Sequence, residues 1–91
     1  MIKLLICDDQ SLFREALRTL LSSYPDLSVI GEAANGEEAL RMVVSTSPDI
    51  VLMDLRMPVM DGVEATRRIN QLGKGIKVIV LTTFDDDETI F

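Results

Sequence analysis

The chain lacks several features on which other classes of protein depend. Its single cysteine, Cys7, allows no disulfide within the chain, so a reducing compartment such as the cytoplasm fits the composition. No apolar run approaches the ~20 residues of a membrane span, and the first residues are not a signal peptide, because an acidic pair ends them. The basic residues are scattered and the net charge is −6, so we expect no nucleic-acid surface within these residues.

What the chain does have is short apolar runs at regular intervals. Hydrophobic residues make up 47% of its 91 residues, enough for the core of one domain. The apolar runs predict strands at 2–7, 27–33, 50–53 and 77–81, with a segment of helical periodicity after each of the first three. Polar residues interrupt the second run, which indicates an edge strand. This alternation predicts an α/β fold, with a parallel sheet and helices on both faces.

Local signals predict where the first helix begins and ends, and which residues form its apolar stripe. Ser11 is its expected N-cap and Pro25 is expected to stop it. The apolar positions, among them Leu12 and Leu20, recur at helical spacing, and Arg14 is expected to point away from that stripe.

Acidic residues follow two of the predicted strands. Asp8 and Asp9 come directly after the first, and Asp54 follows the third. In an open parallel sheet the ligand crevice lies beyond the carboxyl ends of the strands, so these side chains converge if the two strands are neighbours. Clustered carboxylates must share protons or bind a cation, and oxygen ligands favour a hard cation such as Mg²⁺. A different acidic run, residues 85–88, is expected to begin a helix.

The order of these motifs resembles the receiver domain of bacterial two-component response regulators. The matching positions are Asp8-Asp9, Asp54, the loop 54–62 with Met57-Pro58 and Asp61-Gly62, and Thr82-Thr83. Residues 35–40 and 81–84 are most similar to the NarL/FixJ subfamily, in which the receiver precedes a helix-turn-helix DNA-binding domain. The resemblance implies a flavodoxin-like, doubly wound parallel sheet of strand order 2-1-3-4, and a cytoplasmic signalling protein that regulates transcription.

The resemblance also implies a role for each matching residue. Asp54 would be the phosphoacceptor, attacking the phosphohistidine of a sensor histidine kinase, and Thr82 the hydroxyl that bonds the phosphoryl group afterwards. Mg²⁺ would be held by Asp8, Asp9, Asp54 and the backbone carbonyl of Arg56. Pro58, Asp61 and Gly62 would shape the loop into the third helix. Such a protein is not a conventional enzyme, although it takes part in its own phosphorylation and dephosphorylation at Asp54.

The sequence departs from the family in one respect. The family carries a lysine at the end of its fifth strand, whereas Lys3, Lys74 and Lys77 all lie at the opposite end of the expected sheet. We therefore expect residues 1–91 to be a receiver domain that lacks the fifth strand and the last helices, and that takes up phosphate poorly. The open edge of the fourth strand is expected to support a homodimer or strand exchange. DNA would be bound only through a domain absent from this sequence.

Three other functions are compatible with parts of this pattern. A hydrolase of the haloacid-dehalogenase type is disfavoured because Gln10 stands where its second aspartate would be. A dinucleotide-binding domain is disfavoured because the loop after the first strand has no glycine. An interaction module that works without phosphorylation remains the alternative, and a substitution at Asp54 distinguishes it from the receiver.

Overall fold

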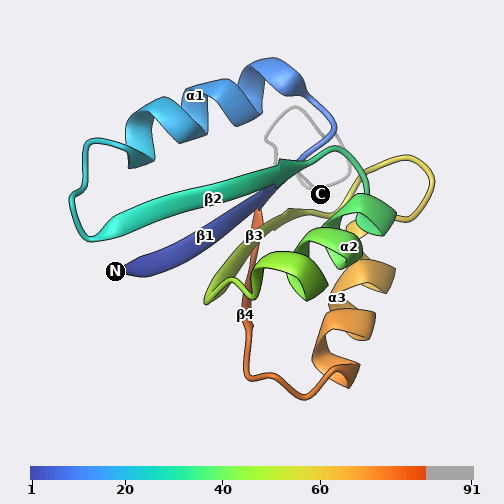
Figure 1. Ribbon diagram of the computed structural model, residues 1–91. Helices are drawn as coiled ribbons and strands as arrows, with labels where there is room; N and C mark the ends of the chain where they lie inside the picture. Colours follow the sequence, from blue (N-terminus) through green and yellow to red (C-terminus); the bar gives the residue numbers. More distant parts are fainter. Residues whose placement is uncertain (82–91) are drawn as a thin grey trace, which may run out of the picture.

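The computed structural model describes residues 1–81, so Thr82 and the acidic run 85–88 lie outside the described residues. The elements are β1 (Ile2–Cys7), α1 (Ser11–Leu21), β2 (Leu27–Ala33), α2 (Gly36–Thr46), β3 (Ile50–Asp54), α3 (Gly62–Gln71) and β4 (Lys77–Leu81). All strand pairs are parallel and the order is β2-β1-β3-β4 (Figure 1). The predicted strand order is confirmed, and so is the prediction that β2 is an edge strand.

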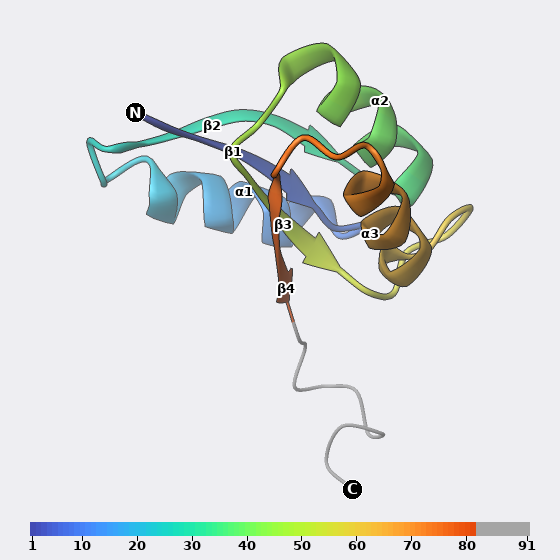
Figure 2. The ribbon, with the colours of Figure 1, turned by 90° about the horizontal axis from the view of Figure 1, so that it is seen from below.

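The helices lie on both faces of the sheet, with α1 on one face and α2 and α3 on the other (Figure 2). The main core fills the second of these layers, between the sheet and α2 and α3. Its buried residues are Leu5, Cys7, Ala33, Ala39, Val43, Val51, Met53, Met57, Ala65 and Ile69. The arrangement confirms a doubly wound sheet. Among the described helices, none combines the length and hydropathy needed to cross a membrane.

Cys7 belongs to this core and is fully buried. Burial, together with the nearby charges of Asp8 and Glu38, raises the pKa of its thiol to about 12. The residue is therefore a packed apolar side chain at neutral pH, as expected for an unpaired cysteine in a strand.

Two expectations about α1 were wrong. Ser11 is the first helical residue and the N-cap is Gln10, whose side chain caps nothing. The cause is Asp8: its Oδ1 accepts a hydrogen bond from Gln10 N at 2.8 Å, and this side-chain turn leads the chain into the helix one residue early. Arg14 does not face away, since its side chain is only 16% exposed, whereas Leu12 is 77% exposed.

The other two helices have side-chain caps. Asn35 accepts a hydrogen bond from Glu38 N at the start of α2, and Asp61 accepts one from Glu64 N at the start of α3, both at 2.9 Å. Each cap satisfies one of the backbone N–H groups that a helix leaves unpaired at its first turn. The start of α3 is thereby fixed at Asp61-Gly62, directly after the loop that follows β3.

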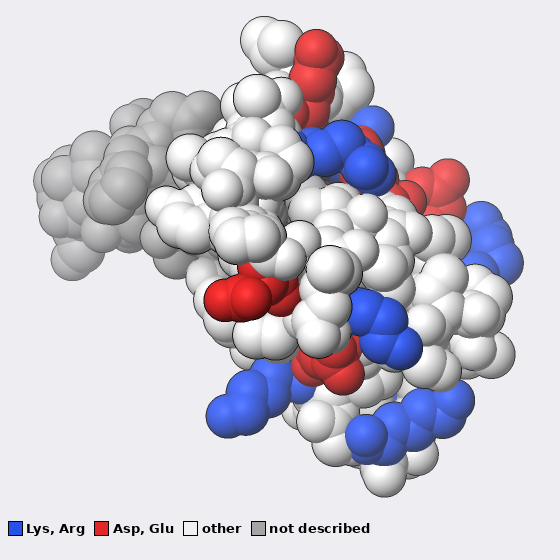
Figure 3. Space-filling view, turned by 60° about the vertical axis from the view of Figure 1, so that its left-hand side comes forward, with Lys and Arg blue, Asp and Glu red and all other residues white. Residues whose placement is uncertain are grey.

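The outer edge of β4 carries exposed apolar residues. Ile79 is 48% and Val80 44% exposed, and strand alternation places them on opposite faces of the sheet. Within the described residues β4 pairs only with β3. Elsewhere the surface is mixed: the face in Figure 3 intersperses acidic and basic groups and shows no continuous basic patch.

Candidate functional site

The structure brings together the acidic residues that follow β1 and β3. The two strands are neighbours, and Cys7 pairs with Met53 at their carboxyl ends. Asp8, Asp9 and Asp54 each offer a carboxylate oxygen to one small space, and these oxygens lie within 4.8 Å of one another. The strand order therefore produces the expected convergence, while the roles of the three residues stay predictions.

Asp8 is the most constrained of the three carboxylates. It is 1% exposed, and its Oδ2 atom has no hydrogen-bond partner within the described part of the chain. Burial raises the pKa of Asp8 and the charge of Asp9 adds to that effect, whereas the hydrogen bond from Gln10 and the charge of Arg14 lower it. A buried carboxylate oxygen that lacks a partner is costly. A cation would supply the missing partner and offset the repulsion.

Asp54 lies in a similar environment at the end of β3. It is 7% exposed, and its Oδ1 accepts a long hydrogen bond, 3.4 Å, from the backbone N of Arg56. Burial raises the pKa of Asp54, and the charges of Asp8 and Asp9 raise it as well. The three carboxylates that meet here fit Mg²⁺, which takes carboxylate ligands and keeps several waters. The carbonyl of Arg56 as a further ligand stays a prediction.

The loop after β3 is held tightly beside Asp54. Met60 N donates to the carbonyl of Pro58 at 2.7 Å, and Val59 between them has a φ of 69°, the geometry of a strained γ-turn. The Met60 carbonyl in turn accepts a hydrogen bond of 2.8 Å from Gly36 N. The loop is therefore tied to the start of α2 on one side and to the end of β3 on the other.

Gly62 allows α3 to begin against the strand that carries Asp54. Its N–H donates to the Leu55 carbonyl at 2.9 Å. A Cβ on Gly62 would lie 2.1 Å from the carbonyl oxygen of Asp54, far inside van der Waals contact. This position therefore has no room for a side chain, while the loop-shaping role of Gly62 stays a prediction.

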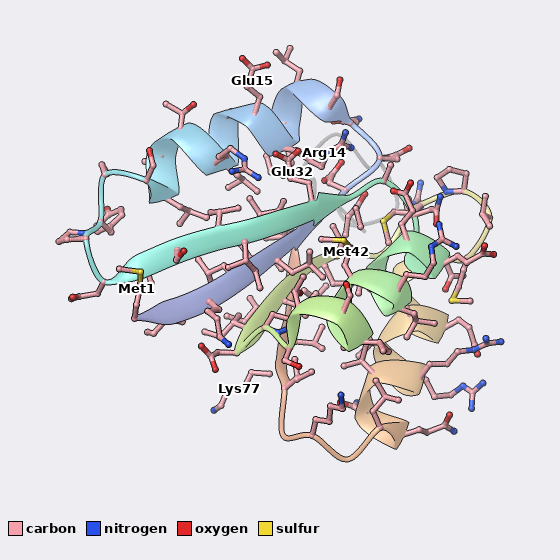
Figure 4. All side chains as sticks on the ribbon, viewed as in Figure 1. Met1, Arg14, Glu15, Glu32, Met42 and Lys77 are labelled. Carbon is pink, nitrogen blue, oxygen red and sulfur yellow. The ribbon has the colours of Figure 1, made fainter. Side chains whose placement is uncertain are left out.

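Two residues beside the site were not found from the sequence. Arg14 of α1 donates a hydrogen bond to the backbone carbonyl of Asp8, and it pairs with Glu32 of β2 (Figure 4). The one available signal was an acidic residue, Glu32, in an otherwise mostly apolar strand. A charged residue there needs a partner, and the helix that covers the same face is the place to look for it.

Comparisons with known proteins agree with this geometry. The family model described as "Response regulator receiver domain" matches residues 4–91. The transcriptional regulatory protein LiaR of Bacillus subtilis is 46% identical over 91 residues, which are 100% of this chain and 43% of LiaR. The response regulator protein VraR of Staphylococcus aureus is 42% identical over 90 residues, which are 99% of this chain and 43% of VraR. The chain thus spans less than half the length of these relatives.

Solved structures point the same way. A LuxR-family DNA-binding response regulator from Staphylococcus aureus has a TM-score of 0.87 at 30% identity, with 99% of this chain and 75% of that chain covered. The receiver domain of the putative response regulator NarL from Mycobacterium tuberculosis has a TM-score of 0.83 at 33% identity, with 87% and 64% covered. The chain therefore belongs to the response regulator receiver domain family, and its relatives are response regulators of the LuxR/NarL type.

Proposed function

We propose that Asp54 of this receiver domain accepts a phosphoryl group from the phosphohistidine of a sensor histidine kinase in the cytoplasm, in a reaction that requires Mg²⁺. The observation that carries the proposal is the cluster of Asp8, Asp9 and Asp54 at the carboxyl ends of adjacent strands, with oxygens within 4.8 Å. The relatives named as transcriptional regulators support an output domain that binds DNA, in a part of the protein outside this sequence.

The proposed reaction follows from the chemistry of these side chains. An oxygen of Asp54 attacks phosphorus, the P–N bond of phosphohistidine breaks, and the electron pair of that bond leaves with the imidazole, which takes up a proton. A later attack by water at phosphorus returns the carboxylate. Mg²⁺, held by Asp8, Asp9, Asp54 and the Arg56 carbonyl, would neutralise charge between the carboxylate and the phosphoryl oxygens.

The chain's own residues prepare Asp54 for this step. Its burial excludes most of the water around it, and the nearby charges of Asp8 and Asp9, which contribute to its raised pKa, favour a bound cation. Pro58, Asp61 and Gly62 are proposed to shape the loop after β3, which follows Asp54 directly. Thr82, which follows β4 in the sequence, is proposed as the hydroxyl that bonds the phosphoryl group and moves its loop.

Replacing Asp54 with asparagine should abolish phosphoryl uptake. The experiment uses this chain and the same chain extended by about 30 residues from the corresponding region of LiaR, which is the scale of one further crossover unit. Each protein would be incubated with acetyl phosphate and Mg²⁺. Intact mass would then be measured. We expect an adduct on the extended chain and little on the 91-residue chain, because the family's lysine lies in the added segment. Residues 1–91 contain no histidine, so an adduct on the 91-residue chain cannot be a phosphohistidine.

Asp26→Asn is the matched control, because Asp26 is exposed in the turn before β2, at the other end of the sheet. It should leave the adduct unchanged. An adduct that survives in Asp54→Asn would contradict the assignment of the phosphoacceptor. No adduct on the extended chain, from acetyl phosphate or from a histidine kinase, would favour an interaction module that works without phosphorylation.

We also propose that the β4 edge pairs with a second copy of the chain. The exposure of Ile79 and Val80 on the two faces of this strand supports the proposal. Sedimentation velocity at micromolar concentration should detect a dimer, and Ile79→Lys should shift it to monomer because a lysine would be buried at the joint. Leu20→Lys, at an exposed position of α1, is the control. A chain that stays monomeric over this range would rule the dimer out.

A further inference from the structure

We infer that Arg14, held in place by Glu32, is a positioning residue for the acidic site: it fixes the turn that carries Asp8 and Asp9. The inference rests on the proposed function insofar as that site binds Mg²⁺.

The side chain of Arg14 connects α1 to two strands. Its Nη1 donates to the backbone carbonyl of Asp8, the first residue after β1, and its Nε donates to Glu32 Oε1 of β2 at 2.9 Å. The guanidinium is therefore placed between the acidic turn and the edge strand, and 84% of the side chain's surface is shielded, since 16% is exposed. Figure 4 shows Arg14 and Glu32 directed toward each other between α1 and β2.

Glu32 is itself held from two sides. Arg18, one turn further along α1, donates from Nε to Glu32 Oε2 at 2.7 Å, so each carboxylate oxygen has an arginine partner. Within the sheet, Glu32 pairs with Ile6, two residues before Asp8. The carboxylate therefore holds Arg14 at one orientation relative to the end of β1, and it does so from a strand that itself carries none of the proposed ligands.

The contacts at Asp8 show what this arrangement accomplishes. Its N–H donates to the Ala33 carbonyl at 3.0 Å, its carbonyl accepts from Arg14, and its Oδ1 accepts from Gln10 N at 2.8 Å. Oδ2 has no partner among the described residues, and Asp8 offers one of its carboxylate oxygens to the proposed cation site. The side chain of Arg14 thus holds the turn at the Asp8 carbonyl.

A purely electrostatic role for Arg14 and Glu32 predicts a different effect of Arg14→Met on Mg²⁺ binding than a positioning role does. If charge alone mattered, removing the cation Arg14 would strengthen Mg²⁺ binding, and removing the anion Glu32 would weaken it. If Arg14 positions the turn, both Arg14→Met and Glu32→Gln weaken binding. The direction of the Arg14→Met effect therefore decides between the two roles.

The test measures Mg²⁺ binding to the chain by isothermal titration calorimetry. We expect Arg14→Met to weaken binding by about tenfold, as for other residues that orient metal ligands, and Glu32→Gln to weaken it less, because Arg14 keeps its bond to Asp8. Arg41→Met is the matched control, since Arg41 forms a similar 2.9 Å pair with Glu37 on the exposed face of α2. Unchanged or tighter binding in Arg14→Met would overturn the inference.

A metal-free measurement keeps the inference testable if Mg²⁺ does not bind. Amide hydrogen exchange by NMR should show faster exchange at Gln10 in Arg14→Met, with α2 and α3 unchanged. Absence of binding by the unmodified chain would refute the proposed metal site, whereas unchanged exchange at Gln10 would refute the positioning role. If Arg14→Met fails to fold, Arg14→Lys serves instead, because a lysine cannot satisfy both partners in the same fork geometry.

Discussion

Gly62→Ala is expected to lower the free energy of unfolding by about 3 kcal/mol, the upper end of the usual range for forcing extra atoms into a packed site. The added Cβ would lie 2.1 Å from the carbonyl oxygen of Asp54 and 2.8 Å from the Cα of Leu55. Both are backbone atoms at the end of a central strand, so α3 must move away from β3 to relieve the contact. Urea unfolding followed by circular dichroism measures the change.

The sign of the change in unfolding free energy is informative, because helix propensity alone predicts that Gly62→Ala stabilises the protein. Alanine is favoured over glycine within a helix by up to about 1 kcal/mol. Gly31→Ala is the matched control: there the new Cβ would meet the Cε of Met42, the free end of a flexible side chain. We expect that variant to lose less than about 1 kcal/mol, as tolerated core changes do. Equal losses in the two variants would contradict the steric explanation.

Asp8→Asn is expected to stabilise the metal-free protein and to remove its response to Mg²⁺. The substitution keeps the acceptor for Gln10 N but removes the charge of a carboxylate that is buried and repelled by Asp9, and whose Oδ2 has no partner within residues 1–81. A gain of about 1 kcal/mol would raise Tm by roughly 4–8 °C in a domain of this size. Thermal unfolding in the presence of a chelator measures this gain.

Mg²⁺ should make the unmodified chain more stable than Asp8→Asn, the reverse of their order without metal. At a concentration one hundred times its Kd, a ligand stabilises the folded state by about 2.7 kcal/mol. The unmodified chain should gain this amount, whereas Asp8→Asn should gain little because one of the three clustered carboxylates is gone. KCl at equal ionic strength separates specific binding from screening, and Asp26→Asn controls for loss of a negative charge elsewhere. Equal stabilisation of the unmodified chain and Asp8→Asn would exclude Asp8 as a ligand.

The strands and the acidic cluster could be predicted because they depend on short-range patterns. Each strand is an apolar run bounded by turn residues, and the observed bounds agree with the expected ones to within one residue. To predict that Asp8 and Asp54 lie close together, only one further fact is needed: β1 and β3 are parallel neighbours. These are properties of local sequence and of sheet geometry.

The arrangement around α1 could not be predicted in the same way. A broad apolar stripe on this helix leaves several positions equally able to face the sheet, and the structure exposes Leu12 and Leu20 while it shields Arg14. That choice depends on Glu32, 18 residues away in the chain, and no periodic pattern links the two. The Oδ2 of Asp8, which has no partner in the part of the chain that the structure describes, could likewise be recognised only once the neighbouring donors had been placed.

The burial of Cys7 has a practical consequence for studying this molecule. Only a thiolate reacts with alkylating reagents, and a thiol with a pKa of about 12 and no exposed surface supplies almost none in the folded state. Alkylation must therefore pass through transient opening of β1. Because the chain has one cysteine, adjacent to Asp8, the labelling rate measures how often β1, the strand that leads into the acidic site, opens. Local unfolding beside the acidic site can thus be measured through the native cysteine, without introducing a probe.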